Sequence, residues 1–157
     1  MIIFLDVDGV LNTVSSPHGV LDAQLKELQN ALFNAFGNEP FGIVLTSSWR
    51  VDRVDDFLKL TTREDLGVSL RHNFIGITPY LCTQPGLDPG KRSLEIQAWR
   101  KMANYNSSRY IIIDDMPGWF TSADIQSPNF LEINGALGFN LSSSLMLSQK
   151  VKTLRGG

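Results

Sequence analysis

Carboxylate and hydroxyl side chains occur in pairs at three places in the chain, each directly after a run of apolar residues. The pairs are Asp6 with Asp8 after residues 1–5, Thr46 with Ser47 after residues 41–45, and Asp114 with Asp115 after residues 110–113. Carboxylates can act as nucleophiles, exchange protons or bind a cation, and hydroxyls can hydrogen-bond an anionic group. A single pair is typical of a polar turn, but three pairs at matching positions indicate a site.

The elements that must position these pairs alternate between strand and helix. Apolar runs predict buried strands at 1–5, 41–45, 110–113 and, shorter, at 130–133. Apolar residues at three- and four-residue spacing predict helices over 21–36 and from about Trp49 to Leu60, a third from about Ser93, and a last one from Ser142 to about Leu154. This order predicts an α/β fold: a Rossmann-like three-layer sandwich with a central, mainly parallel sheet and helices on both faces. The carboxyl ends of its strands would bring the three pairs together.

Four carboxylates in one crevice require a positive partner. Two like charges about 4 Å apart repel by about 4 kcal/mol at an effective dielectric constant of 20. Clustered oxygen ligands without Cys or His favour a hard ion, and Mg²⁺ suits a site that also binds phosphate. A calcium loop of the EF-hand type starting at Asp6 is excluded, because its glycine and glutamate positions hold Leu11 and Pro17.

Composition indicates one ordinary globular domain over residues 1–157. The chain has 14 basic and 16 acidic residues and a formal charge of -2. It therefore lacks the basic excess that strong non-specific binding to nucleic acids would use. Cys82 is the single cysteine, so the chain cannot form an internal disulfide. No apolar run approaches about 18 residues, so we expect no membrane association and a cytoplasmic location.

Four segments resemble the motifs of the haloacid dehalogenase-like (HAD) superfamily of phosphohydrolases. They are LDVDGVLN, IVLTSSWR, GKRSLEIQAW and IIIDDMPGW, in the family's order and covering residues 1 to about 120. The segment TSSWR is similar to capless domains of this family in polynucleotide end-repair proteins. The resemblance implies a Mg²⁺-dependent phosphatase that hydrolyses a phosphomonoester.

The resemblance also implies the roles of the aspartates. Asp6 would attack phosphorus and form an aspartyl-phosphate, and Asp8 would act as general acid and base. Mg²⁺ would be held by the Asp6 carboxylate, the backbone carbonyl of Asp8, and Asp115, with Asp114 as a direct or water-mediated ligand.

The remaining motif positions supply hydrogen bonds and positive charge. Thr46 would hydrogen-bond a phosphoryl oxygen, with Ser47 as the rival for this role. Lys91 would neutralise charge on the nucleophile and the phosphoryl group, and Arg92 is adjacent to it. The start of the predicted helix near Trp49 favours an anion. The residues expected to contact substrate are Gly9, Ser47 and Arg50.

The lengths of two segments bear on the substrate. Only about a dozen residues separate Asp8 from Leu21, too few for a helical cap, and residues 61–90 suffice for a loop or flap insertion but not for a full cap domain. An open site favours a large substrate, a phosphoprotein or a nucleic-acid end. A phosphorylated small metabolite or nucleotide remains an alternative.

Two other classes of protein stay open. A receiver-like signalling module also gathers aspartates, a hydroxyl and a lysine at strand ends, although the order of Thr46, Lys91 and Asp115 fits it poorly. A catalytically silent binding protein is the third hypothesis, and the presence of every motif residue argues against it.

Overall fold

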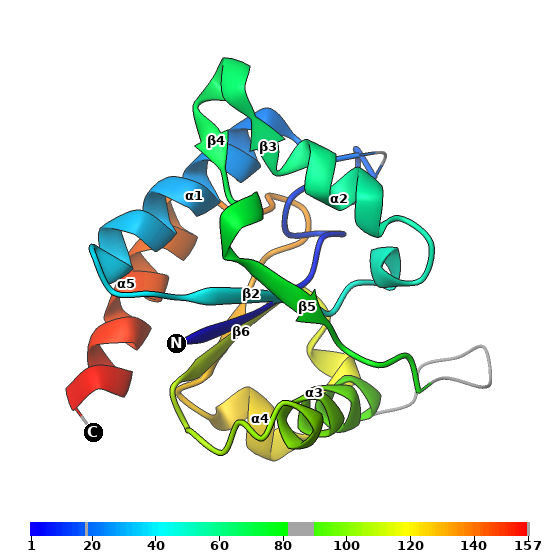
Figure 1. The fold of residues 1–157 in the computed structure, drawn as a ribbon, viewed down its shortest axis with the longest axis vertical. Helices are drawn as coiled ribbons and strands as arrows, with labels where there is room; N and C mark the ends of the chain where they lie inside the picture. Colours follow the sequence, from blue (N-terminus) through cyan, green and yellow to red (C-terminus); the bar gives the residue numbers. More distant parts are fainter. Residues whose placement is uncertain (18, 82–89, 157) are drawn as a thin grey trace.

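A five-stranded, fully parallel sheet forms the centre of the computed structural model, which describes residues 1–17, 19–81 and 90–156 (Figure 1). The strand order is β5-β2-β1-β6-β7. The strands are β1 (Ile2–Leu5), β2 (Gly42–Leu45), β5 (Phe74–Ile77), β6 (Tyr110–Asp114) and β7 (Phe130–Glu132). Cys82 lies outside the described residues.

The strands are apolar on both faces because helices cover both faces. Ile3 and Leu5 of β1 belong to one core cluster, whereas Phe4 between them belongs to a second cluster on the opposite face. All four residues of β1 are buried, and so are those of β2. Continuous apolar runs of this kind are typical of parallel strands in α/β proteins.

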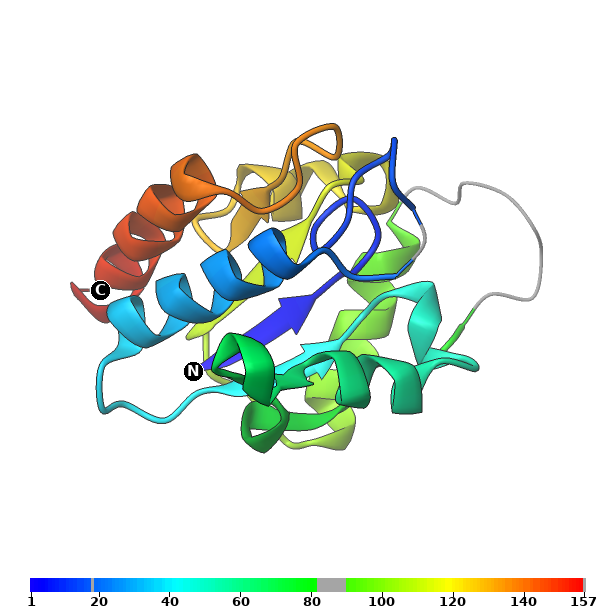
Figure 2. The same cartoon turned by 90° about the horizontal axis from the view of Figure 1, so that it is seen from above.

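The helices form the two outer layers (Figures 1 and 2). Residues of α1 (Asp22–Phe36), α2 (Val54–Leu60) and α5 (Leu141–Gly156) pack in the cluster of Ile3 and Leu5. Ile96 of α3 (Lys91–Met102) and Ile125 of α4 (Ser122–Gln126) pack with Phe4. The predicted three-layer α/β sandwich is therefore confirmed.

Helix boundaries differ from the prediction in two places. The helix predicted over 49–60 consists of a short 3₁₀ helix, η1 (Ser48–Arg50), followed by α2. The helix predicted from Ser93 begins at Lys91, directly after Gly90. The other 3₁₀ helices are η2 (Glu64–Leu66), η3 (Arg71–Asn73) and η4 (Pro117–Trp119).

Residues 61–81 contribute to the fold in two ways. Strands β3 (Thr62–Arg63) and β4 (Val68–Ser69) form a small antiparallel sheet, and β5 adds an edge strand to the central sheet beside β2. The described residues contain no separate cap domain. Whether the segment 61–90 acts as a flap stays a prediction. No described helix has both the length and the apolar composition needed to cross a membrane.

Candidate active site

Three of the predicted aspartates converge at the carboxyl ends of β1 and β6. Each of Asp6, Asp114 and Asp115 offers a carboxylate oxygen within 4.8 Å of the others. Their proximity follows from the register, because Leu5 at the end of β1 pairs with Ile113 of β6. Asp6 and Asp114 are buried, whereas Asp115 is half-buried. The structure thus assembles a compact set of oxygen donors.

The guanidinium of Arg92 contacts this cluster. Its Nη1 lies 2.5 Å from Oδ2 of Asp114 and 3.1 Å from Oδ2 of Asp6. Burial disfavours the charged guanidinium, but the two carboxylates outweigh burial and raise the pKa of Arg92. The Nζ atom of the neighbouring Lys91 instead lies 5.0 Å from the ring centres of Tyr80 and Trp119. These ion pairs belong to Arg92, the neighbour of the predicted Lys91.

One guanidinium does not neutralise the cluster. Burial, together with the charge of Asp6, raises the pKa of Asp114 to about 8 and that of Asp115 to about 6. Ionised carboxylates are therefore unfavourable here without a further positive charge. The donors are all carboxylate oxygens, which suit a hard divalent cation. The residues present fit such an ion.

Two glycines make room for the carboxylate of Asp115. Gly9 has a φ of +74°, and a Cβ atom on Gly9 would overlap this carboxylate. A Cβ atom on Gly135 would overlap it as well. Gly9 was predicted to contact substrate. The structure adds a second role, because the missing Cβ lets the loop after β1 approach the acidic pair.

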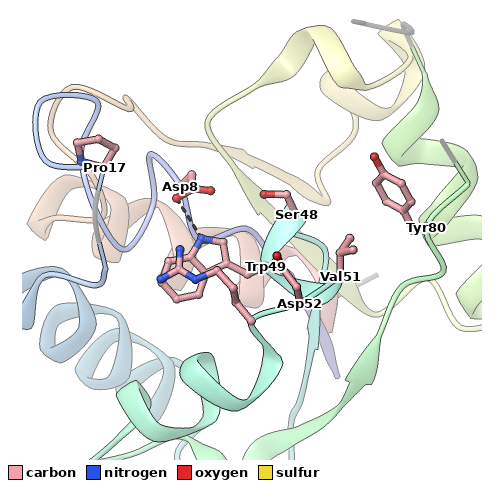
Figure 3. Close-up of a pocket in the computed structure, with 8 residues that line it drawn as sticks. Asp8, Pro17, Ser48, Trp49, Val51, Asp52 and Tyr80 are labelled. Atoms are coloured by element: carbon pink, nitrogen blue, oxygen red, sulfur yellow. Dashed lines mark hydrogen bonds between the residues drawn. The ribbon is translucent and has the colours of Figure 1, made fainter. Parts of the chain in front are cut away.

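Asp8 is held by two donors on one of its oxygens. The side-chain amide of Asn12 donates to Oδ1 over 2.9 Å. The indole N–H of Trp49 donates to the same oxygen over 3.2 Å, the bond drawn in Figure 3. Asn12 also accepts a hydrogen bond from the backbone N–H of Gly9. These contacts orient the carboxylate of Asp8. Sequence patterns did not point to Asn12, because the chain from Asp8 to Asn12 is a turn without the regular spacing of a helix or strand.

Thr46 and Ser47 occupy different environments after β2. The Thr46 hydroxyl is buried and has no hydrogen-bond partner among the described residues. The backbone N–H of Thr46 donates to the carbonyl of Leu5, so it lies beside Asp6. The Ser47 hydroxyl accepts a hydrogen bond from the backbone N–H of Trp49 and caps η1. The free hydroxyl is therefore that of Thr46.

Arg50 is buried and bonded within the protein. Its Nη1 donates to the backbone carbonyls of Thr46 and Ser47, and its Nη2 lies 2.5 Å from Oε2 of Glu95 in α3. These bonds connect the end of β2 to α3. The contact between Arg50 and substrate that the sequence predicts stays a prediction.

Three of the four predicted aspartates open into a cavity of about 420 Å³. Asp6, Asp8 and Asp115 contribute to its wall, together with Arg92 and Trp119. This volume is sufficient for a phosphoryl group with its attached oxygen substituent. The cavity therefore combines acidic donors, a cation and access for a ligand.

A parallel α/β sandwich with an acidic pair after β1 and another at the end of β6, in this order, defines a HAD-like domain. Residues 2–143 match the family described as "HAD domain in Swiss Army Knife RNA repair proteins", and the chain belongs to this family. No curated protein and no solved structure gave a significant match. The family confirms the resemblance drawn from the four sequence motifs.

Proposed function

We propose that the protein is a Mg²⁺-dependent phosphatase that removes a terminal phosphomonoester from a nucleic-acid end, RNA in particular. The observation that carries the proposal is the convergence of Asp6, Asp114 and Asp115 around Arg92, with Asp8 in the same cavity. The family, named for RNA repair proteins, supports the choice of substrate.

Asp6 and Asp8 divide the covalent chemistry. A carboxylate oxygen of Asp6 attacks phosphorus, the bond from phosphorus to the ester oxygen breaks, and Asp8 gives its proton to the departing oxygen. Water then attacks the phosphorus of the aspartyl-phosphate and loses a proton to Asp8, which releases inorganic phosphate and restores Asp6. The two donors on Oδ1 of Asp8 leave its other oxygen to carry this proton.

The surrounding residues stabilise charge. Asp6, Asp114 and Asp115 would hold Mg²⁺, together with the backbone carbonyl of Asp8. When bound, the ion offsets the repulsion between the acidic groups and the phosphate. The free hydroxyl of Thr46 donates to a phosphoryl oxygen.

The sequence predicts that Lys91 neutralises charge on the nucleophile and on the phosphoryl group. In our proposal, Arg92 and Lys91 divide this role between them. Arg92 holds the nucleophile through its ion pair with Asp6. Lys91, whose Nζ atom lies 5.0 Å from the ring centres of Tyr80 and Trp119, would supply charge toward the phosphoryl group.

The absence of a cap in the described residues favours a large substrate whose own bulk excludes water. A phosphoprotein would satisfy this requirement too, and small metabolites or nucleotides are the alternative of the same mechanism. The family name favours nucleic-acid ends over both.

The test is hydrolysis of a panel of phosphomonoesters with Mg²⁺: 3′- and 5′-phosphorylated oligonucleotides, phosphopeptides and phosphorylated metabolites. We expect Asp6→Asn to lower turnover by on the order of 10³-fold or more. Asp55→Asn, which changes an exposed carboxylate on α2, is the matched control and should leave turnover unchanged.

Two results would contradict the proposal. Equal turnover by wild type and Asp6→Asn would exclude Asp6 as nucleophile. A long-lived phosphoprotein after treatment with acetyl phosphate, without turnover, would instead identify a receiver-like module.

A further inference from the structure

A second cavity, of about 530 Å³, adjoins the catalytic one (Figure 3). The two cavities share Asp8, Pro17 and Ser48. The other residues that line the second cavity are Trp49, Val51, Asp52, Arg53 and Tyr80. Its volume lies in the range of cavities that bind small organic groups. None of the motifs in the sequence accounts for Val51, Asp52, Arg53 or Tyr80.

The direction of the reaction places the leaving group in this second cavity. Asp6 lines the catalytic cavity but not the second one, whereas Asp8 lines both. If Asp6 attacks phosphorus and Asp8 protonates the departing oxygen, that oxygen lies within hydrogen-bond reach of Asp8. The group attached to it then extends from Asp8 away from Asp6. This step rests on the proposed function.

The walls of the cavity suit a flat aromatic group. The guanidinium carbon of Arg53 lies 3.5 Å from the ring centre of Trp49, so the guanidinium is stacked on the indole. Trp49 is buried, but the Arg53 side chain is 39% exposed, which leaves guanidinium surface open to the cavity. Tyr80, 54% exposed, lies across the cavity from Trp49 (Figure 3).

The charges in the cavity favour a neutral polar group over a second phosphate. The exposed carboxylate of Asp52 lines the wall, and Asp56 lies 3.5 Å from Nε of Arg53. These carboxylates offset the charge of Arg53 and repel anions. Asp52 can accept hydrogen bonds from hydroxyl or amino groups, which ribose and the nucleobases provide.

We propose that this cavity binds the nucleoside that carries the terminal phosphate, with its base stacked on the guanidinium of Arg53 and bordered by Tyr80. Nucleobases stack on aromatic rings and on guanidinium planes with little dependence on sequence. The cavity thus gives the domain a preference for nucleotides over simple alkyl phosphates. This preference does not require a basic protein surface.

The first test compares kcat/KM for phosphorylated dinucleotides, in both 3′ and 5′ forms, with kcat/KM for β-glycerol phosphate. We expect Arg53→Ala to lower the ratio of the two values by about tenfold. Arg53→Lys keeps the charge but lacks the plane, so it should lower the ratio as well. Tyr80→Ala should lower the ratio, and Tyr80→Phe should retain it.

The matched control is Arg109→Ala. Arg109 is an exposed arginine directly before β6, at the opposite end of that strand from the acidic pair. The ratio should not change in this variant. If Arg53→Lys had the same ratio of kcat/KM values as the wild type, charge and not stacking would select the substrate. That result would overturn the proposal.

Binding separates this proposal from the proposed function. On the Asp6→Asn background, calorimetry with the same dinucleotides should show that Arg53→Ala weakens binding by about tenfold. If wild type hydrolyses no phosphomonoester but Arg53→Ala weakens binding, the phosphatase fails and the nucleoside site stands. If wild type hydrolyses both substrates and Arg53→Ala changes neither ratio nor binding, the nucleoside site fails and the phosphatase stands.

Discussion

Among the residues that the structure describes, Arg50 and Arg92 are buried in clusters that differ in their charge balance. Arg50 pairs with one carboxylate, that of Glu95. Arg92 pairs with two, Asp6 and Asp114, and Asp115 lies beside them. The first cluster is neutral, whereas the second has an excess of negative charge. The neutral pair of Arg50 and Glu95 stabilises the fold, whereas the negatively charged cluster around Arg92 can bind a cation.

The hydrogen bonds around Arg50 and Glu95 support a structural role for this pair. Arg50 donates to the backbone carbonyls of Thr46 and Ser47, and Oε1 of Glu95 accepts a hydrogen bond from the backbone N–H of Leu81. Burial lowers the pKa of Arg50, and Glu95 opposes that shift. The pair therefore joins the end of β2, the start of α3 and the segment after β5.

The largest effect should come from breaking the neutral pair. Arg50→Met leaves the carboxylate of Glu95 buried without its partner, and we expect a loss of about 3 to 5 kcal/mol in the free energy of unfolding. The double variant Arg50→Met with Glu95→Met should recover most of this loss. Denaturant unfolding measures both. A double variant as unstable as the single one would contradict the assignment.

The acidic cluster should make stability depend on pH in the absence of metal. The pKa values of Asp114 and Asp115 in the folded state, about 8 and about 6, lie above the value of about 3.9 expected in the unfolded chain. Between these pH values the folded state binds more protons than the unfolded state. The free energy of unfolding therefore decreases as pH rises from about 4 to about 8.

The size of the pH effect should be at least about 3 kcal/mol, because the buried Asp114 contributes over the whole range from pH 5 to about 8, while the half-buried Asp115, which solvent screens, adds less. Thermal unfolding in the presence of a chelator, at pH 5 and at pH 9, measures it. Mg²⁺ should restore stability at pH 9 and have little effect at pH 5, because protons compete with the metal. If the metal-free protein were more stable at pH 9 than at pH 5, the raised pKa values of Asp114 and Asp115 would be contradicted.

A smaller effect should follow from Gly9→Ala. The new Cβ would overlap the Asp115 carboxylate, and the positive φ of +74° adds strain. Gly67→Ala is the control, because Gly67 also has a positive φ, +67°, but a Cβ there meets nothing within 4 Å. We expect Gly9→Ala to cost about 2 kcal/mol more than the control and to weaken Mg²⁺ binding. If Gly9→Ala and the control variant lost the same free energy of unfolding, the Asp115 carboxylate would tolerate the added methyl group.

The smallest effect should come from Trp49→Phe. This change keeps an aromatic ring but removes one of the two donors on Oδ1 of Asp8. A hydrogen bond to a charged group contributes about 1.5 kcal/mol, so kcat should decrease about tenfold. Turnover of β-glycerol phosphate measures the effect. Unchanged kcat would mean that Asn12 alone orients Asp8.

Sequence patterns predicted the sheet and the position of the aspartates because both follow from local rules. Apolar runs indicate buried parallel strands, and parallel strands place the residues that follow them at one edge of the sheet. Asp6, Thr46 and Asp114 could thus be assigned to one crevice from the sequence. The family motifs then suggested their chemistry.

The sequence could not decide between Lys91 and Arg92. Adjacent residues at a helix start point about 100° apart, so which one meets the carboxylates depends on the residue at which α3 begins. The prediction placed that start at Ser93, whereas the helix begins at Lys91. The pair of Arg50 and Glu95 was equally hidden, because 45 residues separate them and tertiary packing alone brings them together.

Mg²⁺ binding tests the difference between the two clusters most directly. Titration calorimetry should detect one Mg²⁺ site in the wild type, a site at least tenfold weaker in Asp115→Asn, and an unchanged site in Glu64→Gln, which alters an exposed carboxylate of η2. Wild-type affinity in Asp115→Asn, or no Mg²⁺ binding by the wild type, would contradict the assignment of the acidic cluster as a cation site.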